Sequence, residues 1–419
     1  MKTGFATWMK QNRLSGLYYV LVVLGYTATL FFTGMRPGVF ATLLMALVVL
    51  ELVFHKELLI GSLPDIMVVC FFVYQILSLI WLRAGGYPFS VFAEEFISSV
   101  LPMVFYFVGK TAGDRTFRWY RWYLIAMLIL GILGVILYAW APQFYNDWSF
   151  AWNHTSKADA ATTRVRMNSV VGSTCLSFTM VAGMLSGAYF LSAHEDNEAK
   201  KQEDASKSNS RRSSLIFGIV CMALCFLFAI LANQRSGLVA AALVIVYVNY
   251  LLFFDLHLIK RKYFWIELCV IAGLFLAACA IRFDYVLKFW YRIISLPSAI
   301  SERSEQWVAA VNNMYSVWLG NGLGANGHRA IGIEGAHVIA DGGLIKLYCE
   351  NGVLGFSMWL FLVILACKRG LKRIAVYYTE LGIVAIGILQ SIGSNMLAFQ
   401  LCAPVFWFAI GKLCEKDPD

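Results

Sequence analysis

The chain has 419 residues, of which 60% are apolar and only 14% are charged. A soluble domain of ordinary composition carries about 25% charged residues, which cover its surface. The missing charge excludes a water-covered protein and indicates an integral membrane protein. The apolar runs are long and continuous, which favours membrane-spanning helices over the short alternating strands of a β-barrel.

The formal net charge is +9, from 34 Lys and Arg against 25 Asp and Glu. In a membrane protein such an excess serves to orient helices, so we expect no nucleic-acid partner. The ten cysteines lie in or close to apolar runs, and no histidine or second close cysteine pair completes a metal site. We therefore expect no disulfide, no metal and no cofactor.

Twelve apolar runs have about the length that a helix needs to span the hydrocarbon core, roughly 20 residues. They are centred on residues 17–33, 38–54, 64–82, 92–109, 120–140, 169–193, 214–232, 238–255, 263–281, 341–365, 376–395 and 397–412. The sequence therefore predicts an all-α fold: a polytopic membrane helix bundle of about twelve spans with a large, partly helical outer loop.

Lysine and arginine recur along the chain in a pattern that predicts its orientation. If the N-terminus lies inside, the inner segments hold most of the basic residues, at positions 2–13, 56, 110–121, 200–212, 260–262, 368–373 and 412–416. Basic residues are enriched on the cytoplasmic side of membranes. We expect both termini inside. Residues 1–281 then hold nine spans, residues 282–340 form the large outer loop, and residues 341–419 hold three spans.

Nine of the twelve basic residues predicted on or near the outer side are arginines. The arginines are Arg36, Arg83, Arg164, Arg166, Arg235, Arg282, Arg292, Arg303 and Arg329, and the lysines are Lys157, Lys288 and Lys346. Orientation alone does not require this choice, whereas a guanidinium grips phosphate oxygens in a bidentate fork. The bias favours an external anion site, and ordinary interfacial arginines are the alternative.

Two further segments precede the large loop. The outer segment 141–168 is rich in Phe, Tyr and Trp, which indicates an interfacial aromatic belt or, alternatively, a stacking platform for sugar rings or a lipid chain. The inner segment 194–213 is polar and charged, so we expect a flexible linker there.

The large outer loop contains two patterns. From Ser301, the predicted N-cap, the run SERSEQWVAAVNNMYSVW places six apolar residues on one helical face: Trp307, Val308, Val311, Met314, Tyr315 and Trp318. This predicts an amphipathic helix on the bundle or the membrane surface. The glycine-rich LGNGLGANG follows at residues 319–327. It superficially resembles a phosphate-binding loop, but no strand precedes it, so flexible turns are the favoured interpretation.

The tenth predicted span begins with a candidate for proton transfer. His337 opens the segment, and Asp341 follows four residues later on the same expected helical face. An imidazole beside a carboxylate is a candidate general base, and a solvated histidine is the alternative. Lys346 and Glu350 have the same spacing deeper in the span. They are predicted to form a structural ion pair, because charges at that depth need partners.

These patterns together resemble a known family. Arg303, Trp307, the glycine-rich segment, the His337–Asp341 segment and then Glu350, Gly352 and Gly355 are similar to the core of the O-antigen ligase and polymerase superfamily of bacterial envelope glycosyltransferases. NQRSGLVAAALV, which contains Arg235, resembles the family's arginine-led helix, and RVRMNSVVG, which begins at Arg164, resembles an earlier outer segment.

The resemblance implies a GT-C-like ligase of the bacterial inner membrane. It implies transfer of O-antigen from undecaprenyl diphosphate to a sugar hydroxyl of lipid A-core at the periplasmic face, without ATP, metal or cofactor and with inversion. The donor, the acceptor and membrane lipids are the expected partners. Arg235, Arg292 and Arg303, then Arg164 and Arg166, are the candidate ligands of the diphosphate.

Two matters stay open at this stage. In many family members the histidine is spaced from the paired glycines as Asp341 is from Gly352 and Gly355, so either His337 or Asp341 is the base. The alternatives of function are an O-antigen polymerase or a protein O-oligosaccharyltransferase of the same superfamily. A twelve-helix secondary transporter is the alternative from another class.

Overall fold

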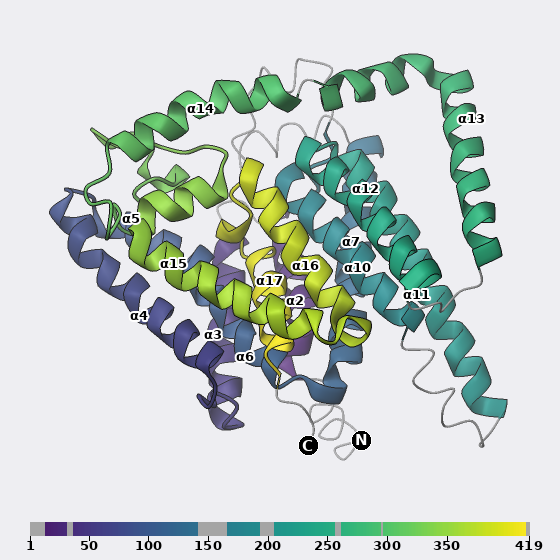
Figure 1. The fold of residues 1–419 in the computed structure, drawn as a ribbon, viewed down its shortest axis with the longest axis horizontal. Helices are drawn as coiled ribbons and strands as arrows, with labels where there is room; N and C mark the ends of the chain where they lie inside the picture. Colours follow the sequence, from purple (N-terminus) through teal and green to yellow (C-terminus); the bar gives the residue numbers. More distant parts are fainter. Residues whose placement is uncertain are drawn as a thin grey trace.

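The computed structural model describes residues 13–31, 37–140, 166–192, 205–255, 261–294 and 296–415 (Figure 1). The regular structure within these ranges is entirely helical. Eight of the described helical segments are long and apolar enough to cross a membrane, and three shorter apolar helices accompany them. The chain is therefore a helix bundle with transmembrane character, and the total of twelve spans remains a prediction.

The helices occur in three groups along the chain. The first group comprises α2 (Leu14–Ala28), α3 (Pro37–Phe54), α4 (Leu63–Ala84), α5 (Phe89–Glu95), η1 (Phe96–Val100), η2 (Leu101–Val104), α6 (Phe105–Lys110), η3 (Gly113–Arg115) and α7 (Thr116–Trp140). The second comprises α10 (Ser173–Ser192), α11 (Ala205–Ala232), α12 (Arg235–Tyr250), η4 (Leu251–Asp255), α13 (Arg261–Ile294) and α14 (Leu296–Asn312). The third comprises η5 (His328–Ala330), α15 (Gly343–Leu371), α16 (Ile374–Gly393), η6 (Met396–Ala398) and α17 (Ala403–Leu413).

Two sequence expectations change at the level of elements, and a third lies outside the described residues. The helix α13 continues past residue 281 to Ile294, so the beginning of the expected outer loop is helical. The helix α11 begins at Ala205, inside the expected linker 194–213. The aromatic part of the outer segment 141–168 falls within 141–165, outside the described residues, so its role stays a prediction.

Small residues allow a close helix contact in the core. The helices α6 and α17 cross where Gly109 meets the backbone of Phe408 and Gly411 meets the backbone of Tyr106. Beside this crossing the rings of Trp119 and Phe408 stack with centroids 3.6 Å apart. Without a hydrophobic force between helices in lipid, such close packing supplies much of the association energy.

The helix α4 runs from one end of the bundle to the other. Near its start, Asp65 pairs with Lys110 at 2.6 Å, and near its end Leu82 packs against Gly322 of the large loop. The 17 positions between Asp65 and Leu82 correspond to about 25 Å along a helix, close to the thickness of a hydrocarbon core. The basic residues Arg13 and Arg115 share Glu57 at the Lys110 end. The helix α14 lies across the opposite end, at the top of Figure 1.

The crossing of α6 and α17 predicts a sharp effect of one methyl group. In Gly411→Ala the new Cβ would overlap the carbonyl oxygen of Tyr106, so we expect a loss of about 1–3 kcal/mol or failure to fold. Gly16→Ala on α2 is the matched control, because nothing lies within 4 Å of its Cβ position and alanine favours a helix by about 1 kcal/mol. Thermal unfolding in detergent distinguishes the two. Equal midpoints would contradict the packing of α6 on α17.

Candidate functional site

The helix α15 is broken inside its length. Gly352 has φ 59° and ψ −170°, which interrupts the helix between Asn351 and Val353. The freed amides of Val353 and Leu354 donate to the carbonyl oxygens of Val317 and Trp318, at 2.9 and 3.1 Å. A chain segment from the large loop therefore completes the amino end of the second half of the helix, as buried backbone at this depth requires.

The same loop completes the carboxyl end of the first half of α15. The carbonyl oxygens of Cys349 and Glu350 accept from the amides of Asn321 and Gly322, at 2.8 and 2.9 Å. The hydroxyl of Tyr74, on α4, donates to the carbonyl oxygen of Asn351 at 2.7 Å. The loop is thus inserted into the break and forms part of the bundle.

The glycine-rich segment is a buried, hydrogen-bonded loop, so the expectation of flexible turns was wrong. All residues from 320 to 327 are buried. Gly320, Gly322 and Gly324 have φ between 78° and 90°, a region in which side chains are strained, and Gly322 lies against the Cβ of Leu82. The amides of residues 320–327 donate to groups of the protein itself. They are therefore not available as a phosphate-binding nest.

The amphipathic helix is α14, and it differs at both ends from the expected run. It begins before Ser301, which is not its N-cap, and it ends at Asn312. Residues after Asn312 leave the helix because their backbone is bonded elsewhere: the amide of Tyr315 to Asn321, and the carbonyls of Val317 and Trp318 to α15. Of the expected apolar face, Trp307 packs inward, whereas Val308, Val311, Tyr315 and Trp318 are exposed.

Residues 337–342 form a non-helical segment, here called the strap, and α15 begins only at Gly343. The expectation that His337 opens the helix was therefore wrong. The carbonyls of His337, Ile339 and Ala340 accept from Asn326 and Asn395, which leaves them unavailable to a helix. The four-residue spacing places two side chains on one face only in a helix. Because this segment is not helical, the spacing does not pair the imidazole of His337 with the carboxylate of Asp341.

Asp341 pairs with an arginine in place of His337. Its Oδ2 lies 2.7 Å from Nη2 of Arg303, and both side chains are about one-third exposed. Arg303 also donates to the carbonyl oxygen of Gly393 at 3.2 Å. The indole of Trp307, one turn further along α14, donates to the carbonyl oxygen of Asp341 at 2.7 Å. The helix α14 thus carries both groups that hold Asp341.

His337 is held through its backbone by one asparagine. Asn326 is fully buried; its Nδ2 donates to the carbonyl oxygen of His337 at 2.7 Å, and its own carbonyl oxygen accepts from Ile339 at 2.9 Å. The Oδ1 accepts from Asn321 at 2.8 Å. The amide of Asn326 donates to Glu350 at 3.3 Å. The glycine-rich loop therefore fixes the position of the strap.

Four other arginines were predicted to bind the diphosphate, and the structure describes the side chains of two of them, Arg166 and Arg235. The amide of Met167 donates to the carbonyl oxygen of Leu231 at 3.0 Å, which places Arg166 close to the α11–α12 junction where Arg235 begins α12. Arg164 lies outside the described residues, and Arg292 lies in α13 with a side chain outside the description. The fold thus pairs Arg303 with Asp341 on the strap, and it brings Arg166 close to the Arg235 region at a separate place.

The expected pair of Lys346 and Glu350 is confirmed, with Nζ and Oε1 3.5 Å apart. Sequence reasoning missed its third member, Glu95, whose carboxylate bonds Lys346 directly. Glu95 ends α5, where the span 89–110 passes into the π-helix η1. An acidic residue inside an apolar span was the available signal, since such groups are rare and need partners.

Comparison with known families and proteins supplies no assignment. The chain matches no family model, and no curated protein matches it. The resemblance to the O-antigen ligase and polymerase superfamily therefore rests on the residues and their order along this chain.

Asn326→Ala is predicted to loosen the strap. The substitution removes a side chain that bonds His337 and Asn321, and each orphaned buried group costs about 1–3 kcal/mol. Hydrogen exchange of the peptide containing residues 333–341 should become faster. Asn313→Ala is the control, because Asn313 is exposed and bonds only its own helix. Unchanged exchange in the Asn326 variant would contradict the role of this residue in holding the strap.

Proposed function

We propose that this protein is a glycosyltransferase of the bacterial inner membrane. It transfers O-antigen polysaccharide from undecaprenyl diphosphate to a sugar hydroxyl of lipid A-core on the periplasmic face. The observation that supports the proposal is the strap: Arg303 of α14 pairs with Asp341 on the segment that also carries His337. One segment thus carries the candidate base and holds the candidate cation for the diphosphate.

The chemistry needs little beyond these groups. The acceptor hydroxyl oxygen attacks the anomeric carbon, the bond from that carbon to the phosphate oxygen breaks, and the diphosphate leaves on its lipid. His337 takes the hydroxyl proton in this scheme. Arg303 stabilises the charge that develops on the leaving group. Because the donor bond is already activated, no ATP is required.

Two enzymes of the same superfamily use the same donor chemistry and differ in the acceptor. A polymerase adds the chain to another lipid-linked repeat unit, and a protein O-oligosaccharyltransferase adds it to a protein hydroxyl. The site residues serve all three, so the ligase is proposed on the order and spacing of the motifs. The acceptor has to be identified by experiment.

A second class of function has its own supporting observation. The broken helix α15 and the buried charges Glu95, Lys346 and Glu350 are features that secondary transporters use for substrate and ion sites. A transporter would carry its substrate across the membrane of a vesicle and would form no glycosidic bond. The transfer assay below separates the two classes.

His337→Ala should lower the rate of transfer about 10²–10⁴-fold, because a positioned base contributes that much. Asp341→Asn should cost less, since it removes the partner of Arg303 and leaves the imidazole in place. His328→Ala, an exposed outer histidine, is the control. The assay uses purified protein, lipid-linked donor and lipid A-core. The reverse order of effects would identify Asp341 as the base. If neither variant changes the rate, the strap takes no part in the transfer reaction.

Depletion of the protein from cells tests the acceptor. A ligase predicts loss of all polymer-capped lipopolysaccharide on a gel, with polymer retained on undecaprenyl diphosphate. Accumulation of lipid A-core bearing a single repeat unit would instead identify the polymerase. Unaltered lipopolysaccharide would exclude both.

The proposed orientation predicts different labelling of two engineered cysteines. Ser301→Cys on α14 should react with a membrane-impermeant thiol reagent added from the periplasm, whereas Ser206→Cys at the start of α11 should react only after the membrane is opened. The reason is the enrichment of basic residues on the inner side. Equal reaction of both from the periplasm would refute the orientation.

A further inference from the structure

Two carboxylates and one ammonium group are buried together between α5 and α15. The side chains of Lys346, Glu95 and Glu350 are 7%, 4% and 3% exposed. Lys346 bonds Oε1 of Glu95 and lies 3.5 Å from Oε1 of Glu350. Fully ionised, this triad carries one unmatched negative charge, and an unpaired charge buried at membrane depth costs several kcal/mol.

The described neighbours do not supply the missing positive charge. Arg329 is paired with Glu94 at 3.1 Å, and both side chains are about half-exposed. Burial, and to a smaller extent the Glu350 carboxylate, raises the pKa of Tyr87 above its ordinary value, so that phenol is neutral.

The other titratable groups around the triad are also uncharged donors or thiols. The hydroxyl of Tyr74 on α4 donates to the carbonyls of Leu319 and Asn351, and Cys349 precedes Glu350 on α15. From the glycine-rich loop only neutral amides face Glu350, those of Gly324 and Asn326. They lessen the cost of the carboxylate and leave its charge in place.

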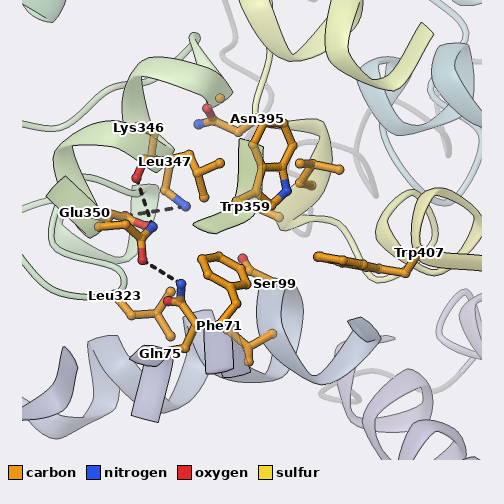
Figure 2. Close-up of a pocket in the computed structure, with 15 residues that line it drawn as sticks. Phe71, Gln75, Ser99, Leu323, Lys346, Leu347, Glu350, Trp359, Asn395 and Trp407 are labelled. Atoms are coloured by element: carbon orange, nitrogen blue, oxygen red, sulfur yellow. Dashed lines mark hydrogen bonds and ion pairs between the residues drawn. The ribbon is translucent and has the colours of Figure 1, made fainter. Parts of the chain in front are cut away.

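A cavity opens beside the triad (Figure 2); most of its wall is apolar, and several polar side chains reach it on the side of the triad. Its lining includes Lys346, Glu350, Gln75, Asn395 and Trp359. The space open to the centre of a water-sized sphere is about 50 Å³, room for a few water molecules. A sugar ring is too large for it.

Three buried polar atoms of this cavity lining have no partner among the described residues: Oε1 of Gln75, Oδ1 of Asn395 and Nε1 of Trp359. The orientations of the Gln75 and Asn395 side-chain amides are fixed by the hydrogen bonds that their nitrogens donate. Nε2 of Gln75 donates to Oδ1 of Asn351 at 2.5 Å, and Nδ2 of Asn395 donates to two carbonyls of the strap. The oxygens are therefore left as acceptors, and buried polar groups of this kind are satisfied by water.

We propose that the Glu95–Lys346–Glu350 triad binds one exchangeable proton, which reaches it through water in this cavity. The proton forms an O–H bond on one carboxylate and changes the net charge of the triad from −1 to zero. A metal ion is not the expected occupant, because the ammonium group of Lys346 already lies between the two carboxylates. The proposal does not depend on the glycosyltransferase function.

Proton binding at this site has a structural consequence. Glu350 holds the glycine-rich loop through its side chain and its carbonyl, and the loop holds the strap through Asn326. Hydrogen bonds to an ionised carboxylate are roughly twice as strong as neutral ones. Protonation of the triad therefore weakens the attachment of the loop. The effect is passed to the backbone of His337 through Glu350 and Asn326, which are hydrogen-bonded to one another.

Infrared difference spectroscopy of the purified, intact protein tests the proposal. Between about pH 5 and about pH 9 we expect the carbonyl band of one protonated carboxyl group to titrate and to shift in D₂O. Both Glu350→Gln and Glu95→Gln should remove it, because the proton belongs to the coupled pair. Glu94→Gln, an exposed neighbour, should retain it. Glu380→Gln identifies any band of Glu380, a buried carboxyl outside the cavity lining; the further buried carboxyl, Asp65, is paired with Lys110.

The outcomes separate clearly. A titrating band lost in both triad variants and kept in Glu94→Gln supports the proposal. A band that survives both triad variants, or one that never exchanges in D₂O, overturns it. If neither triad variant folds, the Glu380→Gln protein decides: a titrating band in that protein supports the proposal, and no protonated carboxyl at any of these pH values overturns it.

Discussion

The break in α15 at Gly352 is the constraint on which the glycine-rich loop and the strap depend. A helix interrupted within the membrane exposes backbone donors and acceptors that water cannot satisfy there. Here the large loop supplies them from both sides: Val317 and Trp318 accept at one half-helix, and Asn321 and Gly322 donate at the other. Because these bonds fix the loop, they also fix Asn326, and with it the strap that carries His337 and Asp341.

The glycines explain why the loop fits into so small a space. Gly320 lies against the backbone of α15 at the break, and Gly322 lies against Leu82 of α4, so neither position admits a Cβ. Positive φ at both makes glycine necessary for a second reason. The asparagines of the loop hydrogen-bond to one another and to the backbone, so that the polar groups of this buried network have partners. A loop of this composition is an internal part of the bundle even though its sequence has the appearance of a surface turn.

The sequence predicted the helices well and the connections between distant residues poorly. The spans 64–82 and 376–395 correspond closely to α4 and α16, because long apolar runs report directly on membrane-spanning helices. The Lys346–Glu350 pair followed from helical spacing. The partner Glu95 is 251 positions away, and the Arg303–Asp341 pair joins two segments with irregular backbone between them. Spacing along one chain carries no information about such contacts, whereas glycine at every second position from 320 to 324 was a usable signal of a buried loop.

The pairing of Arg303 with Asp341 bears on how the proposed donor would be recognised. A guanidinium bonded to a carboxylate and to the carbonyl of Gly393 is already oriented, so little side-chain freedom is lost when a phosphate oxygen approaches it. The pair is one-third exposed, which leaves a face of the guanidinium accessible. On the same helix, Val308 and Val311 present apolar side chains outward, and such a helix lies at the boundary between headgroups and acyl chains. A lipid-linked diphosphate has its phosphates at that boundary and its sugar outside it. In the proposed function, the arginine on α14 would therefore meet the diphosphate at that boundary, next to the strap that it holds through Asp341.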